Sequence, residues 1–314
     1  MEVFNSYIMP ATIETLAQMV DKFNENSRGA IRLTTAGFDG DFYQESFFAS
    51  LHGAQRRVDR YATNDAASVT SLAQAKEVGV KVAGGFGPIL FEPAQLTWLQ
   101  KPTAEGIEVA SRNFAEALLA DQLNTAIAGL VAAIGNQSAA VFDNTTGGIT
   151  HQAINSGHAK FGDASSRIVA DVMNGSTYHK LIGSNLLNGQ MLFQAGNVQV
   201  VDVLGRAIVV TDAPSLFVDA TTDKDLVLGL VDSAAIVWDG GDVTSNIQTN
   251  NGKNRIETTM QVDYAFGLSL KGYAWDTANG GKSPTDAELA TGSNWDKVAT
   301  SIKNTAGVLI KGNA

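Results

Sequence analysis

Three segments of the sequence predict an α+β fold with more than one structural unit. Residues 105–134 contain no proline and repeat apolar residues at helical spacing, which predicts one long helix. Residues 225–239 and 255–275 are rich in strand-forming residues, and the second run alternates apolar and polar side chains. Residues 149–216 alternate helical segments with short apolar ones, as an α/β layer does. A chain of 314 residues has room for about two domains.

The first 30 residues predict a single amphipathic helix that ends in a polar run, 24–29. Its apolar residues recur at spacings of three and four and are Ile13, Leu16, Ala17, Val20 and Phe23.

Residues 30–92 predict an extended ribbon. Two segments with little helical character, 50–62 and 77–91, are separated by a polar stretch at 63–76. Gly84, Gly85 and Gly87 do not form a dinucleotide motif, so we expect a flexible bend of the ribbon there.

The segment 105–134 predicts a rod roughly 45 Å long. Its apolar stripe consists of Leu119, Leu123, Ile127, Leu130 and Ile134.

In the segment 149–216 we expect a helix at 150–161, a strand at 168–173, a second helix after the turn 174–176, and a strand at 207–210. The hydroxyl of Ser176 is a candidate cap for the second helix.

The two β-rich runs are separated by residues 240–254, which predict a loop, and we expect both runs to return to the sheet under the long helix. Pro284, Thr285 and Asp286 predict the start of a short helix near the end of the chain.

No motif in the sequence predicts catalysis or a cofactor. There is no cysteine, and Gly281-Lys282-Ser283 is not a phosphate loop because Asp276 stands where its first glycine is required. His151 and His158, seven residues apart, lack a third metal ligand at a suitable spacing, and we expect both on the surface. We therefore expect neither an enzyme nor a cofactor.

The low share of charged residues indicates a protein whose surface is largely buried in contacts with partner proteins. Charged residues make up 17% of the chain, against a usual share of about 25%. The net charge of −10 disfavours a large contact with nucleic-acid phosphates. We expect no secretory signal, no segment of the ~18 to 20 apolar residues that cross a membrane, and no membrane partner.

The order of elements in 149–216 resembles the middle of tailed-phage major capsid proteins of the Hong Kong 97 type. Phe161-Gly162-Asp163 stands where a helix ends in a Leu-Gly-Asp-like turn, and Leu204-Gly205-Arg206 leads into a strand in the same way. The turn 174–176 stands where a Met-His-Ser turn is common, with Asn174-Gly175 at the histidine.

The resemblance implies the capsid fold of that family, with an N-terminal arm, an extended β-ribbon loop, a peripheral domain and an axial domain. The corresponding residues are 1–30 for the arm, 31–92 for the loop, 93–145 and 225–314 for the peripheral domain with its spine helix at 105–134, and 146–224 for the axial domain.

The resemblance also implies a structural role. Copies would assemble in the host cytoplasm into hexamers and pentamers and form an icosahedral head shell of the virion, which encloses DNA without sequence-specific binding. Scaffold, portal and decoration proteins are further expected partners. The expected intersubunit contacts are Phe42, Tyr43, Arg56, Arg57 and Asp59. For the last three residues, a solvated charge cluster and an intersubunit ion pair are equally good interpretations.

Two alternatives remain open from the sequence. The same fold would serve an encapsulin-like shell around cargo enzymes, and an unrecognised α/β enzyme or binding domain would fit the element pattern. The tail from Pro284 to Trp295 resembles one phage coat subfamily and favours the phage head.

Overall fold

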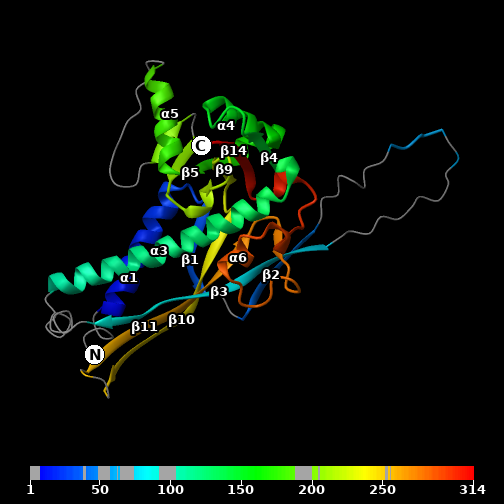
Figure 1. The fold of residues 1–314 in the computed structure, drawn as a ribbon. Coiled ribbons are helices and arrows are strands. Elements are labelled where there is room, and N and C mark those ends of the chain that lie inside the picture. Colours follow the sequence, from blue (N-terminus) through cyan, green and yellow to red (C-terminus); the bar gives the residue numbers. More distant parts are fainter. Residues whose placement is uncertain are drawn as a thin grey trace.

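The computed structural model describes residues 8–37, 40–48, 57–61, 63, 74–91, 104–187, 200–203, 206–251, 254 and 256–314. Within these residues, two seven-stranded sheets lie on either side of one long helix, α3 (Ala104–Gly135). Figure 1 shows α3 running through the molecule between the long strands and the group formed by α4, β5 and β9.

The long sheet contains the longest strands of the protein, in the order β1-β10-β11-β3-β12-β13, with β2 paired to β3. Its strands are β1 (Ile31–Gly37), β2 (Phe42–Phe48), β3 (Gln74–Phe91), β10 (Ala235–Asn250), β11 (Glu257–Leu270), β12 (Tyr273–Trp275) and β13 (Trp295–Lys297). β10, β11 and β3 are antiparallel neighbours, whereas β1 joins β10 in parallel.

The short sheet has the order β4-β14-β9-β5-β7-β6, with β8 paired to β9. Its strands are β4 (Val141–Asn144), β5 (Ile168–Met173), β6 (Val200–Val203), β7 (Arg206–Val210), β8 (Phe217–Val218), β9 (Lys224–Val231) and β14 (Gly307–Asn313). The central strand β9 is buried from Asp225 to Val231, which is typical of a strand covered on both faces.

The prediction of a long helix at 105–134 is confirmed by α3. Its carboxyl-terminal half is buried and contacts both sheets, through Ala126, Ile127, Leu130, Ala133 and Ile134. The expectation that no segment is long and apolar enough to cross a membrane was wrong, because Ser111–Gly135 passes that test by length and composition. The same apolar character suits a helix that is covered on several sides by its own protein.

The predicted N-terminal helix is confirmed as α1 (Met9–Asn26), which lies along α3. Val20 is buried, whereas Ile13 on the same predicted stripe is 58% exposed. The amide of Asn24 bonds both backbone groups of Leu33, at 2.7 and 2.9 Å, and so fixes α1 to β1. That residues 1–30 form an arm reaching a neighbour stays a prediction.

The segment 150–187 follows the predicted order of elements. α4 (His151–His158) is capped by Thr150, a 3₁₀ segment (Ala159–Arg167) leads to β5, and α5 (Gly175–Leu187) follows. The predicted cap at Ser176 was wrong. The N-cap is Asn174, whose side-chain oxygen accepts a hydrogen bond from the backbone N–H of Thr177 at 2.8 Å. This spacing is the usual one, since a capping side chain bonds the N–H two or three residues further along the chain. Ser176 lies inside the first turn.

The interpretation of 225–254 was wrong in two respects. The first β-rich run contains β9 of the short sheet and the start of β10 of the long sheet, so it does not lie in one sheet. The predicted loop 240–254 is mostly strand, because β10 continues to Asn250 and pairs with β11 on both sides of a register shift between Asp239 and Val243. Its glycines lie at a register shift, where a Cβ on Gly240 would come within 2.1 Å of the carbonyl oxygen of Ala265.

The pairing of β9 also bears on the expected domain boundary. β9 pairs with β5 and with β14, so a boundary between residues 224 and 225 separates strands that share backbone hydrogen bonds. Residues 225–314 therefore contribute strands to both sheets.

The end of the chain contains the predicted short helix, α6 (Asp286–Leu289). Thr285 and Glu288 form a reciprocal capping box at its start. Trp275 and Trp295 are both buried, with ring centroids 4.9 Å apart in an edge-on arrangement, and they hold this segment against the long sheet.

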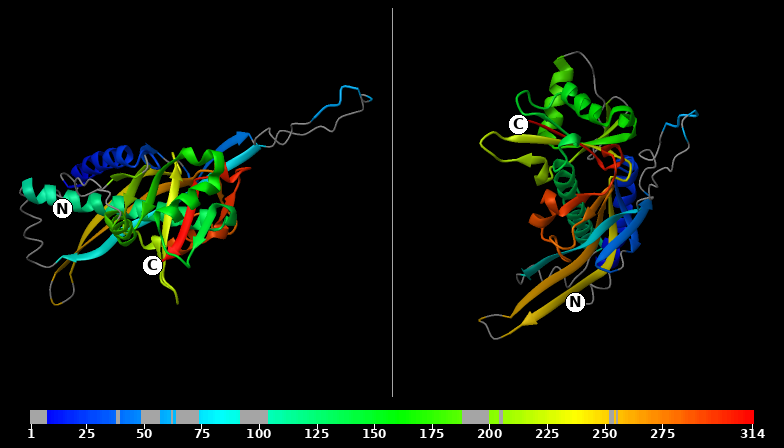
Figure 2. Two further views of the ribbon diagram at one scale, coloured as in Figure 1. Left: turned by 90° about the horizontal axis from the view of Figure 1, so that it is seen from above. Right: turned by 90° about the vertical axis from the view of Figure 1, so that its right-hand side faces the viewer.

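Part of the predicted ribbon is present as the antiparallel pair β2 and β3, and the segment 57–61, which lies between them in the sequence, is far from the two sheets (Figures 1 and 2). The outgoing strand is β2, which precedes the predicted arm at 50–62, and residues 57–59 have no regular secondary structure. β3 continues into the long sheet and pairs with β11. Gly84 and Gly85 thus lie in a paired strand, and Gly87 lies beside a register shift, in place of the expected flexible bend.

Candidate assembly surfaces

The segment 57–61, which contains the predicted contact residues Arg57 and Asp59, lies far from the two sheets (Figure 2). Arg57 and Asp59 are exposed, and beside them Val58 and Tyr61 are 65% and 95% exposed. A carboxylate oxygen of Asp59 accepts the backbone N–H of Tyr61 at 2.9 Å. Arg56 lies outside the described residues. This segment is therefore open to a partner.

Phe42 and Tyr43 lie at the opposite end of the ribbon, where β2 meets the long sheet. Phe42 packs against the core, and Tyr43 points to the opposite face, with its ring centroid 4.9 Å from that of Trp238. The structure therefore places Phe42 and Tyr43 at the base of the ribbon and Arg57 and Asp59 at its tip, and Arg56 lies outside the described residues.

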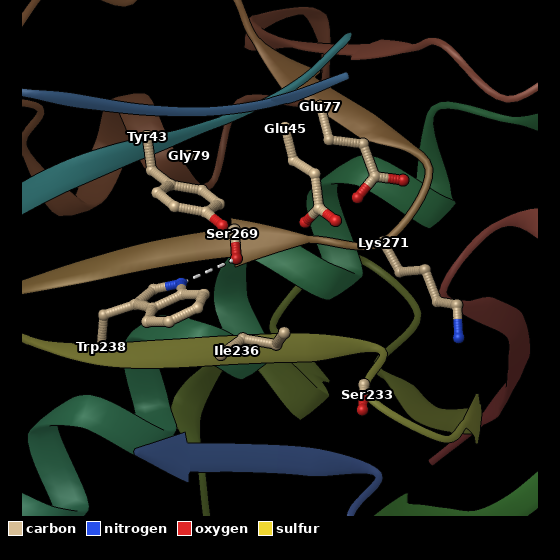
Figure 3. A pocket seen from close by; sticks show the side chains of 9 residues that line it. All are labelled: Tyr43, Glu45, Glu77, Gly79, Ser233, Ile236, Trp238, Ser269 and Lys271. Atoms are coloured by element: carbon tan, nitrogen blue, oxygen red, sulfur yellow. Dashed lines mark hydrogen bonds between the residues drawn. The ribbon is translucent and has the colours of Figure 1, made fainter. Parts of the chain in front are cut away.

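A pocket of about 270 Å³ lies beside Tyr43 on the outer face of the long sheet (Figure 3). Its lining includes Tyr43 and Glu45 of β2, Glu77 of β3, Trp238 of β10 and Ser269 of β11. Side chains alternate across a strand, and the neighbouring residues Val80, Val237 and Leu268 are buried on the face toward α3. The pocket therefore lies on the face that α3 does not cover. We call it the acidic pocket.

Two carboxylates give the acidic pocket its charge. Glu45 and Glu77 are direct partners in the antiparallel pair of β2 and β3. Burial raises the pKa of Glu77, and the nearby charge of Glu45 raises it further, whereas the backbone N–H of Gly272, bonded at 2.7 Å, and Lys271 lower it. The ammonium of Lys271 donates to the carbonyl of Asp232 at 2.8 Å and points away from both carboxylates in Figure 3.

A second open surface is an apolar groove of about 370 Å³ between α1, α3 and the long sheet. Leu16, Val20, Leu118, Val237 and Val243 contribute to its walls. Ile13 at its rim is 58% exposed, and Val243 is 45% exposed. The long sheet thus carries open apolar surface on the helix side and an open charged pocket on the other.

The short sheet, by contrast, encloses a polar cluster. His158 of α4, 3% exposed, lies 2.7 Å from a carboxylate oxygen of Asp171 and 2.9 Å from the guanidinium of Arg206. Because the guanidinium can only donate, Nδ1 of His158 accepts and Nε2 carries the proton that it donates to Asp171. The ring is therefore neutral. The negative charge of Asp171 on one side of it and the positive charge of Arg206 on the other compensate each other.

The expectation that His158 lies on the surface was wrong. The ring is buried against β9, where Gly229 leaves the space, since a Cβ there would come within 2.9 Å of Nε2 of His158. Nε2 of His151 is buried without a hydrogen-bond partner. Among the described residues, no group of three or more His, Asp or Glu side chains is arranged to hold a metal ion. The cluster is a satisfied part of the core.

Several of these residues could not be found from the sequence. Glu45, Glu77 and Trp238 come from three strands that meet only in the folded sheet, and Asp171 and Arg206 lie on neighbouring strands 35 positions apart. The only local signal is the alternation of Tyr43 and Glu45 on one strand, which places them on one face without naming what lies opposite.

Comparison with known proteins identifies the family. A family model described as Major capsid protein 13-like (Gp13-like) matches residues 1–309. The chain belongs to this family of major capsid proteins. A search of curated protein sequences gives no match. The family match favours the phage head over an encapsulin-like shell and over an unrecognised α/β binding domain.

Solved capsid structures have the same fold. The capsid of cyanophage Pam1 matches with a TM-score of 0.54 at 12% identity over 90% of this chain and 88% of the other. A structure of Mycobacterium phage Adephagia gives 0.54 at 12% identity, also over 90% and 88%. The capsid of Helicobacter pylori bacteriophage KHP30 gives 0.51 at 9% identity over 91% and 87%. At such low identities the matches show the fold, which is that of Hong Kong 97-type capsids.

The capsid protein is therefore a structural component of the phage head shell and not an enzyme. It works in the virion, in association with copies of itself. Its functional surfaces are those that meet other copies.

Proposed function

We propose that copies of this chain form hexameric and pentameric capsomers of an icosahedral head shell, in which the ribbon of each copy overlaps its neighbour. The proposed contacts are those at the two ends of the ribbon: Phe42, Tyr43, Arg56, Arg57 and Asp59. In this arrangement α1, at the centre of residues 1–30, also reaches an adjacent copy, and the acidic chain encloses DNA without sequence-specific contacts.

The observation that carries the proposal is the exposure of the segment 57–61. Val58 and Tyr61 are apolar or aromatic, are mostly exposed, and lie on this segment far from the two sheets (Figure 2). Exposed apolar residues gathered on a projecting segment favour contact with a partner. Because Val58 and Tyr61 are not packed against the sheets, they contribute little to the stability of the single chain, and contact with another copy explains their position.

The test is to remove the projecting loop without disturbing the sheet. β2 and β3 are antiparallel, and their last pair is Phe48 with Gln74. Replacing residues 49–73 by Asn-Gly should close the two strands with a tight turn. We expect this variant to stay folded, as measured by circular dichroism and thermal unfolding, and to form no shells in negative-stain electron microscopy.

Wild-type protein expressed in parallel should form capsomers or shells. A matched control replaces residues 252–255, between β10 and β11, by Asn-Gly, which shortens a different connection of the same sheet. Shells formed by the variant that lacks residues 49–73 would contradict the role of the ribbon. A wild-type chain that stays monomeric under all assembly conditions would contradict the proposal as a whole.

A further inference from the structure

The acidic pocket contains two carboxylates that form no ion pair with the described residues, although Lys271 at its edge offsets part of their charge. Within the described part of the chain Glu45 makes no hydrogen bond, and the hydrogen bond of Glu77 is to a backbone N–H. Like charges placed directly opposite each other on paired strands destabilise the pair. The arrangement becomes favourable when a cation lies between or above the two carboxylates.

The wall of the acidic pocket suits one kind of cation. Tyr43 and Trp238 lie side by side next to the carboxylates, with their rings tilted by 34° (Figure 3). A guanidinium stacks on aromatic faces and also bonds carboxylates through its planar fork, which an ammonium does less well. The pocket, of about 270 Å³, is open to the surface of the sheet, so the end of a side chain from another protein surface can enter it.

The chain itself presents such a side chain at the tip of its ribbon. Arg57 and Arg60 are both exposed there, beside Tyr61, and the described residues give neither arginine an ion pair. In Figures 1 and 2 the segment 57–61 lies far from the long sheet, which carries the acidic pocket. In this arrangement the charges of the tip and of the pocket do not meet within one copy, so a second copy supplies the contact.

We propose that the acidic pocket receives Arg57 or Arg60 from the ribbon of a second copy of this chain. The inference rests on the proposed function, since it names the counterpart of the overlapping ribbon. Each copy then gives one tip and receives one, which is a head-to-tail contact. Contacts of this kind close into rings when the rotation between copies allows it. Binding would neutralise the pair of Glu45 and Glu77.

Disulfide trapping tests the contact, because the chain has no cysteine of its own. Affinity-tagged Glu45→Cys protein is assembled together with untagged protein that carries Arg57→Cys or Arg60→Cys, and the particles are oxidised. Because the two cysteines lie on different copies, a disulfide-linked dimer of mixed mass on a non-reducing gel reports a contact between copies. We expect this dimer with at least one of the two arginine positions.

A matched control pairs Asp219→Cys, an exposed carboxylate position after β8, with the same loop cysteines, and we expect no mixed dimer. Particles that form normally but give no mixed dimer from Glu45→Cys would overturn the inference and leave the proposed function standing. Absence of any particles from the wild-type chain would contradict the proposed function and the inference together.

Charge exchange provides a second readout. The variant Glu45→Arg should raise the protein concentration needed for assembly by about tenfold, which corresponds to about one lost charged contact. Adding Arg57→Glu and Arg60→Glu to Glu45→Arg should restore assembly to within about twofold of wild type. Failure of the added changes to improve assembly, in variants whose thermal unfolding is unchanged, would also overturn the inference.

Discussion

The two sheets of this capsid protein manage their polar groups in opposite ways. The short sheet surrounds His158, Asp171 and Arg206 with its own strands and helices and gives each of them a hydrogen-bonding partner. The long sheet leaves Glu45 and Glu77 facing each other across an open pocket. Buried polar groups without partners are costly, and this cluster obtains its partners within one chain. The long sheet can be completed by another copy.

Apolar surface is divided less sharply. The long sheet exposes Ile89, Leu90, Val243 and Ile256 near the ends of its long strands, and the short sheet exposes Phe217 and Val218 on β8, whereas its central strand β9 is buried along nearly its whole length. Among the described residues, the two sheets therefore differ most in how their polar groups are partnered.

The largest expected difference comes from removing one carboxylate in each sheet. Asp171→Ala leaves Nε2 of the buried His158 ring without its acceptor, and we expect the free energy of unfolding to fall by about 3 kcal/mol. Glu45→Ala removes an exposed charge without a partner, and we expect a change within about 0.5 kcal/mol. Urea denaturation of the unassembled chain measures both. Similar losses in the two variants would contradict the comparison.

A smaller effect is expected at the start of α5, beside the short sheet. Asn174→Ala removes the cap on Thr177 and also a hydrogen bond to Asp225, which is 2.9 Å long. We expect a loss of about 1 kcal/mol in the free energy of unfolding. Ser176→Ala, which leaves that cap in place, should cost less than about 0.5 kcal/mol in the same denaturation experiment. The reverse order would show that Ser176 is the cap.

The smallest effect is a pH dependence in the long sheet. The pKa of Glu77 is raised in the folded chain, so the folded state holds this proton more tightly than the unfolded state does. Its contribution to stability is therefore present below the ordinary value of 4.5 and falls as the pH rises through the raised pKa. Glu77→Gln should remove this dependence, with a change in the free energy of unfolding of about 0.5 kcal/mol or less near neutral pH.

The measurement is a series of denaturation curves from pH 4 to pH 8, roughly the range over which a carboxyl with a raised pKa titrates. Glu25→Gln, on the exposed face of α1, controls for the substitution itself. In assembled particles the same titration should shift to lower pH if an arginine occupies the acidic pocket, because an opposite charge lowers a carboxyl pKa. An unchanged difference between wild type and Glu77→Gln at every pH would contradict this assignment.

The sequence by itself determined the elements whose cause is local. The spacing of Ile127, Leu130 and Ile134 predicts the buried face of α3, and Thr285 with Glu288 encodes the start of α6. The strand at Ile168–Met173 was also predicted with its observed bounds, since a short apolar run between polar turns has one good solution. These elements follow from contacts within a few residues.

Only the tertiary structure decided which strands share a sheet and what their outer faces carry. β9 and β10 are close in sequence yet belong to different sheets, because β9 satisfies its backbone hydrogen bonds with β5 and β14, whereas β10 does so with β1 and β11. Strand pairing also explains why His158 lies in the core against Gly229 and why Glu77 lies opposite Glu45. Residue spacing encodes which face a side chain occupies, but strand pairing decides what it meets there.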